Sequence, residues 1–154
     1  MKKLLLICLA AFAAASCTQE KQQSKPLYMW FDCEGNYATL SHPDSIRYYV
    51  SKIHDMGFTD VVVDVKSIMG ETLYKSDIAP YMGEWDGVTR PENYDLLGYF
   101  IEEGHKLGMR VHGSLNVFAG GHNYFDRGII YGDHADWQSQ VYTEAVSYTH
   151  LRAH

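Results

Sequence analysis

The sequence is poor in cysteine and in long apolar runs. It has 154 residues and only 3 cysteines. Cys8 lies inside the N-terminal apolar run and Cys17 comes two residues after that run, so Cys33 stands alone in the remainder. A disulfide framework is therefore excluded within this sequence. The apolar run from Leu4 to Ala15 is too short to span a bilayer comfortably, which excludes a multi-span membrane protein.

Positive charge is also scarce. There are 13 Lys and Arg residues against 19 Asp and Glu residues, so we expect no nucleic-acid partner. Neither G-x-G-x-x-G nor a P-loop follows the first expected strand, and nucleotide binding therefore has no support. What is present is an ordinary globular composition, with 46% hydrophobic and 14% aromatic residues.

The N-terminus has the layout of a bacterial export signal. Lys2 and Lys3 precede the apolar run, and Ala14 to Cys17 resembles a lipobox, in which the cysteine is lipidated after cleavage. We expect residues 1–16 to be a signal peptide, Cys17 to carry lipid, and residues 17–26 to be a polar tether. An ordinary secretory signal cleaved near residue 15 is the alternative. The lipobox predicts a membrane-anchored lipoprotein of the bacterial cell envelope, periplasmic or surface-exposed.

The C-terminus is expected to be foreign to the protein. Residues 146–154 resemble the in-frame translation of a transposase-type sequencing adapter, and Ala145 fits the codon that must precede that frame. The native domain would then cover residues 27–145. Removing residues 1–16 and 146–154 takes away Lys2, Lys3 and Arg152 but no acidic residue, so residues 17–145 are more acidic than the whole chain.

Hydrophobic periodicity alternates between the two values typical of strands and helices. A helix is expected between Ser41, as N-cap, and Gly57, and a second over about Tyr94 to Leu107. A long segment rich in turn residues separates them. The expected strands cover 27–33, 59–66 and 110–118. The turn-rich segment just mentioned covers 67–91.

This order predicts an α/β fold with right-handed crossovers. Two completions are open, a doubly wound sheet and the N-terminal portion, about three β/α units, of a (β/α)₈ barrel of about 250 residues. Polar residues near the C-terminal ends of two strands favour the barrel, whose active sites lie at that mouth. These residues are Asp64 and Lys66 on the second strand and His112, Ser114 and Asn116 on the third.

Several segments together resemble bacterial lipoproteins of the glycosyl-hydrolase-like 10 family. The resemblance covers Tyr28 to about Trp137. It implies a (β/α)₈ barrel and hydrolysis of O-glycosidic bonds in a polysaccharide or cell-wall glycan, with no cofactor. Lys66, Gly113-Ser114 and Val117 depart from the family pattern, so substrate specificity does not carry over. The segments that carry the resemblance are 57–66, 73–76, 94–97, 103–112, 115–116 and 134–137.

A glycosidase needs two carboxyl groups that flank the scissile bond, and this chain supplies one good candidate. Asp64 ends an apolar strand and shares a face with Lys66, so we expect it to be desolvated, charge-coupled and catalytic. The alternative is that Asp64 and Lys66 form a structural ion pair that seals the mouth of the barrel.

Six further residues are expected to bind the glycan. Lys66 and Asn116 lie at strand ends, Asp32 closes the first strand, and His112 could orient a carboxylate or remain an ordinary core histidine. Tyr74 and Trp85 lie in the turn-rich segment and could stack on sugar rings, or simply pack onto the domain.

Two other functions stay open. One is a glycan-binding lipoprotein that lacks the catalytic acids. The other is a metal-dependent deacetylase or amidohydrolase that uses His105, His112, His122 and Asp64. The spacing of these residues is poor for a metal, and neither H-x-H nor H-E-x-x-H is present, so no metal site is predicted.

Overall fold

The computed structural model describes residues 25–132 and 134–139. The predicted signal peptide, the predicted lipidation site Cys17 and the adapter-like tail at 146–154 lie outside the described residues.

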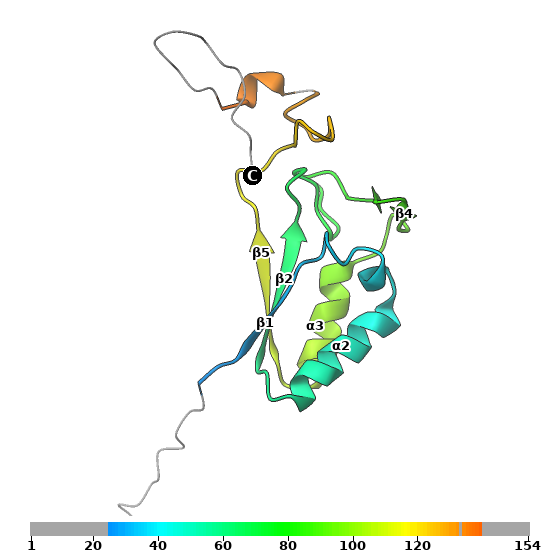
Figure 1. Ribbon diagram of the computed structural model, residues 1–154, viewed down its shortest axis with the longest axis vertical. Helices are drawn as coiled ribbons and strands as arrows, with labels where there is room; N and C mark the ends of the chain where they lie inside the picture. Colours follow the sequence, from blue (N-terminus) through cyan, green and yellow to red (C-terminus); the bar gives the residue numbers. More distant parts are fainter. Residues whose placement is uncertain (1–24, 133, 140–154) are drawn as a thin grey trace, which may run out of the picture.

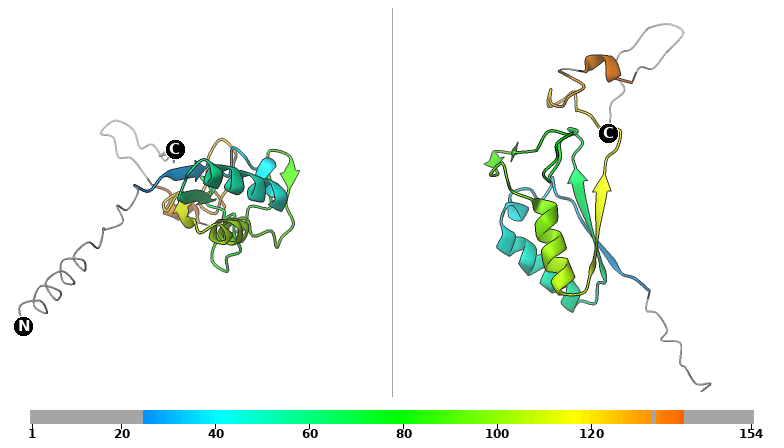
Figure 2. Two further views of the ribbon diagram at one scale, coloured as in Figure 1. Left: turned by 90° about the horizontal axis from the view of Figure 1, so that it is seen from below. Right: turned by 180° about the vertical axis from the view of Figure 1, so that it is seen from behind.

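Three parallel strands form the centre of the structure. They are β1 (Tyr28–Phe31), β2 (Asp60–Lys66) and β5 (Arg110–Leu115), and they lie in the order β1-β2-β5. The crossover helices α2 (Pro43–Asp55) and α3 (Leu96–Lys106) pack together on one face of this sheet (Figures 1 and 2). All five elements fall where the periodicity predicts them.

Alternation along β2 explains why the helices cover one face only. Val61, Val63 and Val65 are buried, whereas Asp64 and Lys66 on the other face are only partly buried. The helices supply the opposing apolar side chains, because α2 buries Ile46, Val50 and Ile53 and α3 buries Leu96 and Phe100. Phe31 of β1 makes an edge contact with Phe100, with ring centroids 4.9 Å apart, and joins the edge strand to this core.

The helix ends agree only partly with the sequence expectations. Gly57 and Gly108 follow the two helices with φ of +93° and +70°, the left-handed conformation that glycine adopts without strain. Ser41 is not the N-cap of α2: it ends the short 3-10 helix η1 (Thr39–Ser41), and His42 occupies the cap position. The cap of α3 is Asp95, whose carboxylate accepts a hydrogen bond from the Gly98 amide at 2.9 Å.

The expected long loop contains a small hairpin. Strands β3 (Glu84–Trp85) and β4 (Val88–Thr89) pair antiparallel across Asp86 and Gly87, which both have positive φ. After β5 the described chain continues in turns and in the short 3-10 helix η2 (Ala135–Trp137). The hairpin and this last segment lie toward the C-terminal ends of β2 and β5 (Figure 1).

The prediction of three β/α units of a (β/α)₈ barrel is wrong. The described residues contain two helices, a three-stranded parallel sheet and a separate antiparallel pair, which is too small and sparse for three such units. No crossover helix follows β5 in this part of the chain. Polar alternation on β2 and β5 predicts a barrel mouth, but it equally suits a sheet whose second face meets solvent.

None of the helices in the described ranges combines the length and the apolar character that a membrane span requires.

Candidate functional site

No helix of the described residues covers the sheet face opposite α2 and α3, and this face carries aromatic and charged side chains. Tyr28 and Trp30 of β1 lie on it and are 53% and 59% exposed. Its other members from β2 and β5 are Asp60, Val62, Asp64, Lys66, Arg110, His112 and Ser114. Exposed aromatic rings beside carboxylates make this face the part of the sheet best suited to bind a ligand.

Trp30 and Asp64 form a fixed pair on this face. Trp30 pairs with Val62 in the parallel register, so Asp64 lies two residues further along the same face. The indole Nε1 of Trp30 donates a hydrogen bond to Asp64 Oδ2 at 2.9 Å. The ring is therefore held in one orientation although more than half of its surface is exposed. The predicted catalytic carboxylate Asp64 thus orients an aromatic ring.

A groove of about 240 Å³ adjoins the same ring at the outer edge of β1. Asn36 brings an amide to this groove and Thr39 a hydroxyl, while Tyr49 of α2 adds a second partly exposed aromatic ring. The full lining is Trp30, Phe31, Asn36, Thr39, Leu40 and Tyr49. An aromatic wall combined with a few polar groups is the usual composition of a small-molecule site.

Asp32 shapes the turn that leads into this groove. Its carboxylate accepts hydrogen bonds from the amides of Glu34 and Gly35, at 3.1 and 2.9 Å. Its backbone carbonyl accepts one from the Asn36 side chain at 2.8 Å. The sequence predicts that Asp32 binds the glycan directly. In the structure Asp32 is exposed, and its carboxylate and carbonyl hold the turn that positions Asn36.

Lys66 and Asn116 come together, but they bind each other's backbone. Lys66 Nζ donates to the carbonyl of Asn116 at 2.7 Å and to that of Ala119, and Asn116 Nδ2 lies 3.4 Å from the carbonyl of Lys66. Partial burial lowers the pKa of Lys66. Within the described residues no ion pair joins Asp64 to Lys66. A register shift between these residues and β5 aims the lysine at the loop after β5.

His112 belongs to a different cluster, nearer the N-terminal end of β2. Its Nε2 lies 2.8 Å from Oδ1 of the buried Asp60. Arg110 donates hydrogen bonds to the same carboxylate from two guanidinium nitrogens, at 2.7 and 2.8 Å, and Thr59 Oγ1 donates to it as well. Arg110 above all holds the pKa of Asp60 well below its usual range. His112 thus serves this ion cluster, with Tyr28 packed against its ring at 5.6 Å.

The two predicted loop aromatics lie away from Trp30. Tyr74 packs partly buried against the hydrophobic core. Trp85 belongs to β3 and lines a separate cavity together with Phe125, its edge-on neighbour at 5.0 Å. Neither residue lines the groove beside Trp30.

Sequence reasoning missed two features of this site. Trp30 shares its strand face with Asp32, and parallel pairing of β1 with β2 could have placed it beside Asp64. Glu34 gave no periodic signal, because it lies in an irregular turn. Its Oε1 is buried without a hydrogen-bond partner in the described part of the chain, and burial raises the pKa of its carboxyl group.

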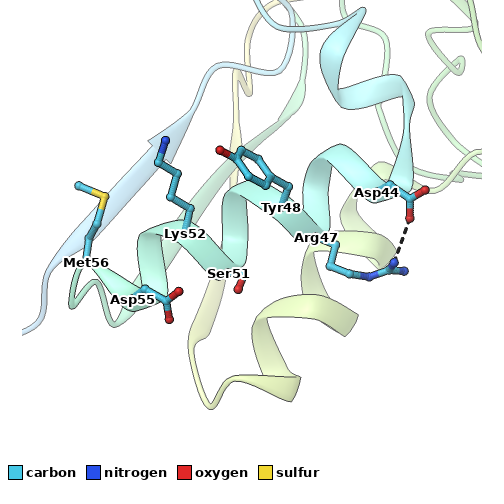
Figure 3. Close-up of a pocket in the computed structure, with 7 residues that line it drawn as sticks. All are labelled: Asp44, Arg47, Tyr48, Ser51, Lys52, Asp55 and Met56. Carbon is cyan, nitrogen blue, oxygen red and sulfur yellow. Dashed lines mark hydrogen bonds and ion pairs between the residues drawn. The ribbon is translucent and has the colours of Figure 1, made fainter.

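A further hollow of about 600 Å³ lies along the outer surface of α2 (Figure 3). Its seven residues follow the helix, and Arg47 pairs with Asp44 across one turn at 2.9 Å. None of them lines the Trp30 groove. Over residues 25–132 and 134–139, no three His, Cys, Asp or Glu side chains converge as metal ligands would.

Comparison with known proteins finds a relative that matches most of this chain. The chain is 28% identical over 127 residues to an S-layer-related protein of Niallia circulans, an alignment that covers 79% of this chain and 8% of the relative. The chain therefore spans less than a tenth of the length of the curated relative that it matches. No family model matches the chain.

This comparison corrects the predicted function. The relative is named an S-layer-related protein and not a glycoside hydrolase, so the prediction that the chain hydrolyses glycosidic bonds is wrong. The roles predicted for single residues are not tested by it, and the family resemblance stays a prediction.

Proposed function

We propose that this chain is a cell-envelope protein that binds a glycan through the groove beside Trp30. One observation carries the proposal: an exposed indole ring is fixed by Asp64 and forms a wall of a groove that also contains an amide and a hydroxyl group. The name of the S-layer-related relative supports a location at the cell surface or in the envelope.

The chemistry of the groove fits a sugar ring. A pyranose has a face of C–H groups that packs on an aromatic ring and a rim of hydroxyl groups that need hydrogen-bond partners. Trp30 supplies the aromatic face, and the Asn36 amide can both donate and accept. Because Asp64 already holds the indole, binding does not have to order that side chain, which lowers the entropic cost of association.

Attachment to the membrane is a second part of the proposal. The signal-like N-terminus and Cys17 support a lipid anchor that would hold the groove near the envelope. Metabolic labelling with a radioactive fatty acid tests this directly. The wild type should carry label and Cys17→Ser should not, and equal labelling of both proteins would contradict the anchor.

Calorimetric titration of the full chain with tetra-N-acetylchitotetraose tests the glycan site. Trp30→Ala should weaken binding about tenfold, equivalent to about 1.4 kcal/mol, because the stacking surface is lost. Asn36→Ala should weaken binding too, while leaving the fold intact by circular dichroism.

Trp137→Ala is the matched control, since Trp137 is also 60% exposed but does not line the groove. It should bind like the wild type. Equal affinities for the wild type, Trp30→Ala and Asn36→Ala would remove Trp30 from the site. The absence of any binding heat with the wild type would reject this oligosaccharide as a ligand.

A further inference from the structure

A second cavity, of about 490 Å³, lies beside the β3–β4 hairpin. Its lining is Glu84, Trp85, Asp86, Gly87, Phe125 and Arg127. It shares no lining residue with the groove beside Trp30, so whatever binds there does so through different contacts.

The hairpin that carries Trp85 has a well-defined turn. Asp86 and Gly87 have φ of +49° and +76°, as a tight two-residue hairpin requires. The Gly87 amide also donates to Glu84 Oε1 at 3.1 Å. The position of Trp85 is therefore set by the backbone of the turn that follows it.

Arg127 connects this hairpin to two other segments. Its guanidinium group binds both carboxylate oxygens of Glu71, at 2.8 and 2.7 Å, and it donates to the carbonyl of Glu84 at 2.9 Å. The same group lies 6.0 Å from the centre of the Trp85 ring. Phe125, two residues before Arg127, meets Trp85 edge-on. An aromatic pair is thus fixed by a bidentate ion pair between residues far apart in sequence.

The charges around this cavity select the class of ligand. Arg127 pairs with Glu71 at 2.7 Å and also lies 3.7 Å from Glu84 Oε2, so one positive charge faces two carboxylates and the cluster stays negative. Asp86 adds a further carboxylate to the lining. Such a site disfavours anions, and its carboxylate oxygens accept hydrogen bonds from hydroxyl groups. The aromatic pair offers an apolar surface for the face of a ring.

We infer that this cavity is a second saccharide site, specific for a neutral sugar residue. The inference goes beyond the glycan site at Trp30 and stands without it, because the two sites share no residue. Where both sites engage one glycan strand, the second contact forms at high effective concentration, so long strands bind more tightly than short ones.

Fluorescence isolates this site, because the chain has only 3 tryptophans. In the full chain carrying Trp30→Phe and Trp137→Phe, Trp85 is the sole indole. Titration with tetra-N-acetylchitotetraose should shift or quench its emission, with saturation. An unchanged spectrum would overturn the inference.

Calorimetry with two further variants separates a direct contact from a structural effect. In the Trp30→Ala background, Phe125→Leu should weaken the remaining binding at least fivefold. Phe118→Leu is the control, because Phe118 is 98% exposed and does not line the cavity. This variant should leave the affinity for the tetrasaccharide unchanged. Equal affinities for the two variants would overturn the site even if the site at Trp30 is real.

Two other probes test the ligand class. Tetragalacturonate, which is anionic, should bind the Trp85-only protein at least tenfold more weakly than the neutral tetrasaccharide. Tetramethylammonium chloride should not compete with that tetrasaccharide. Equal binding of the anionic sugar, or competition by the ammonium ion, would overturn a neutral-sugar site and indicate an ion site in its place.

Discussion

At the scale of single residues, Asp60 has the most complete set of partners among the acids of the sheet. Arg110, His112 and Thr59 all contact its buried carboxylate, and its pKa is depressed. A depressed pKa means that the folded state binds the charged form better than the unfolded state does. This stabilisation is complete above the unfolded pKa of about 3.9 and is lost as pH falls toward the folded value.

We therefore expect Asp60→Asn to lower the free energy of unfolding at pH 7. The difference from the wild type should shrink progressively below about pH 4. Urea unfolding curves at several pH values measure it. The control is Asp77→Asn, which removes the charge of an exposed acid elsewhere in the chain. If the unfolding free energy of Asp60→Asn stays below that of the wild type by a constant amount from pH 7 to pH 3, the charge of Asp60 is not what stabilises the fold.

Glu34 should behave in the opposite way. Burial raises the pKa of its carboxyl group, so its ionised form costs stability at neutral pH and its protonated form does not. Glu34→Gln is expected to raise the melting temperature at pH 7. The gain should disappear as pH falls below about 4.3, where the unfolded carboxyl group is protonated as well. Thermal scans at pH 7 and pH 3.5 test this, and a lower melting temperature at pH 7 would contradict it.

Residue chemistry indicated some of these positions in advance. Sequence reasoning identified Asp64, Lys66 and Asn116 from strand alternation, and the structure does place all three toward the C-terminal end of the sheet. The sequence pattern could not predict the partners of these residues. The hydrogen bond from Trp30 to Asp64 depends on strand register, and the contacts of Lys66 with backbone carbonyls depend on a bulge. Alternation says nothing about either feature.

At the scale of elements, the N-cap of α3 gives a local test of helix stability. Asp95 accepts the Gly98 amide, and no other side chain caps this end in the described structure. Asp95→Ala should cost about 1 kcal/mol of stability, whereas Asp95→Asn should cost much less because asparagine caps almost as well. Denaturant unfolding of both variants measures the difference. Equal losses would show that the charge, and not the cap hydrogen bond, stabilises the helix.

The five long elements were predictable because each has a full apolar stripe or a clear alternation. Their ends were less predictable: β1 stops at Phe31, where Asp32 turns the chain, although the pattern continued to Cys33. The β3–β4 hairpin was missed because two-residue strands have no measurable period. Asp86-Gly87 was the available signal, since this pair favours a tight hairpin turn.

At the scale of the whole molecule, the uncovered sheet face decides how the fold and the function are interpreted. Polar residues on one face of parallel strands predicted a barrel mouth and, through the family resemblance, an enzyme. The described chain instead forms an open sheet with helices on one side only (Figure 1). The pattern of side chains is the same in both cases, so no sequence of this length could distinguish a barrel interior from a face open to ligand or solvent.

The central claim is that the groove at the outer edge of β1 presents Trp30 to a glycan. The indole N–H signals in a nitrogen–proton correlation spectrum test it most directly. The full chain has three such signals, which the three Trp→Phe variants assign. On titration with tetra-N-acetylchitotetraose, the Trp30 signal should shift with saturation while the Trp137 signal stays in place. A stationary Trp30 signal at saturating sugar would contradict the account.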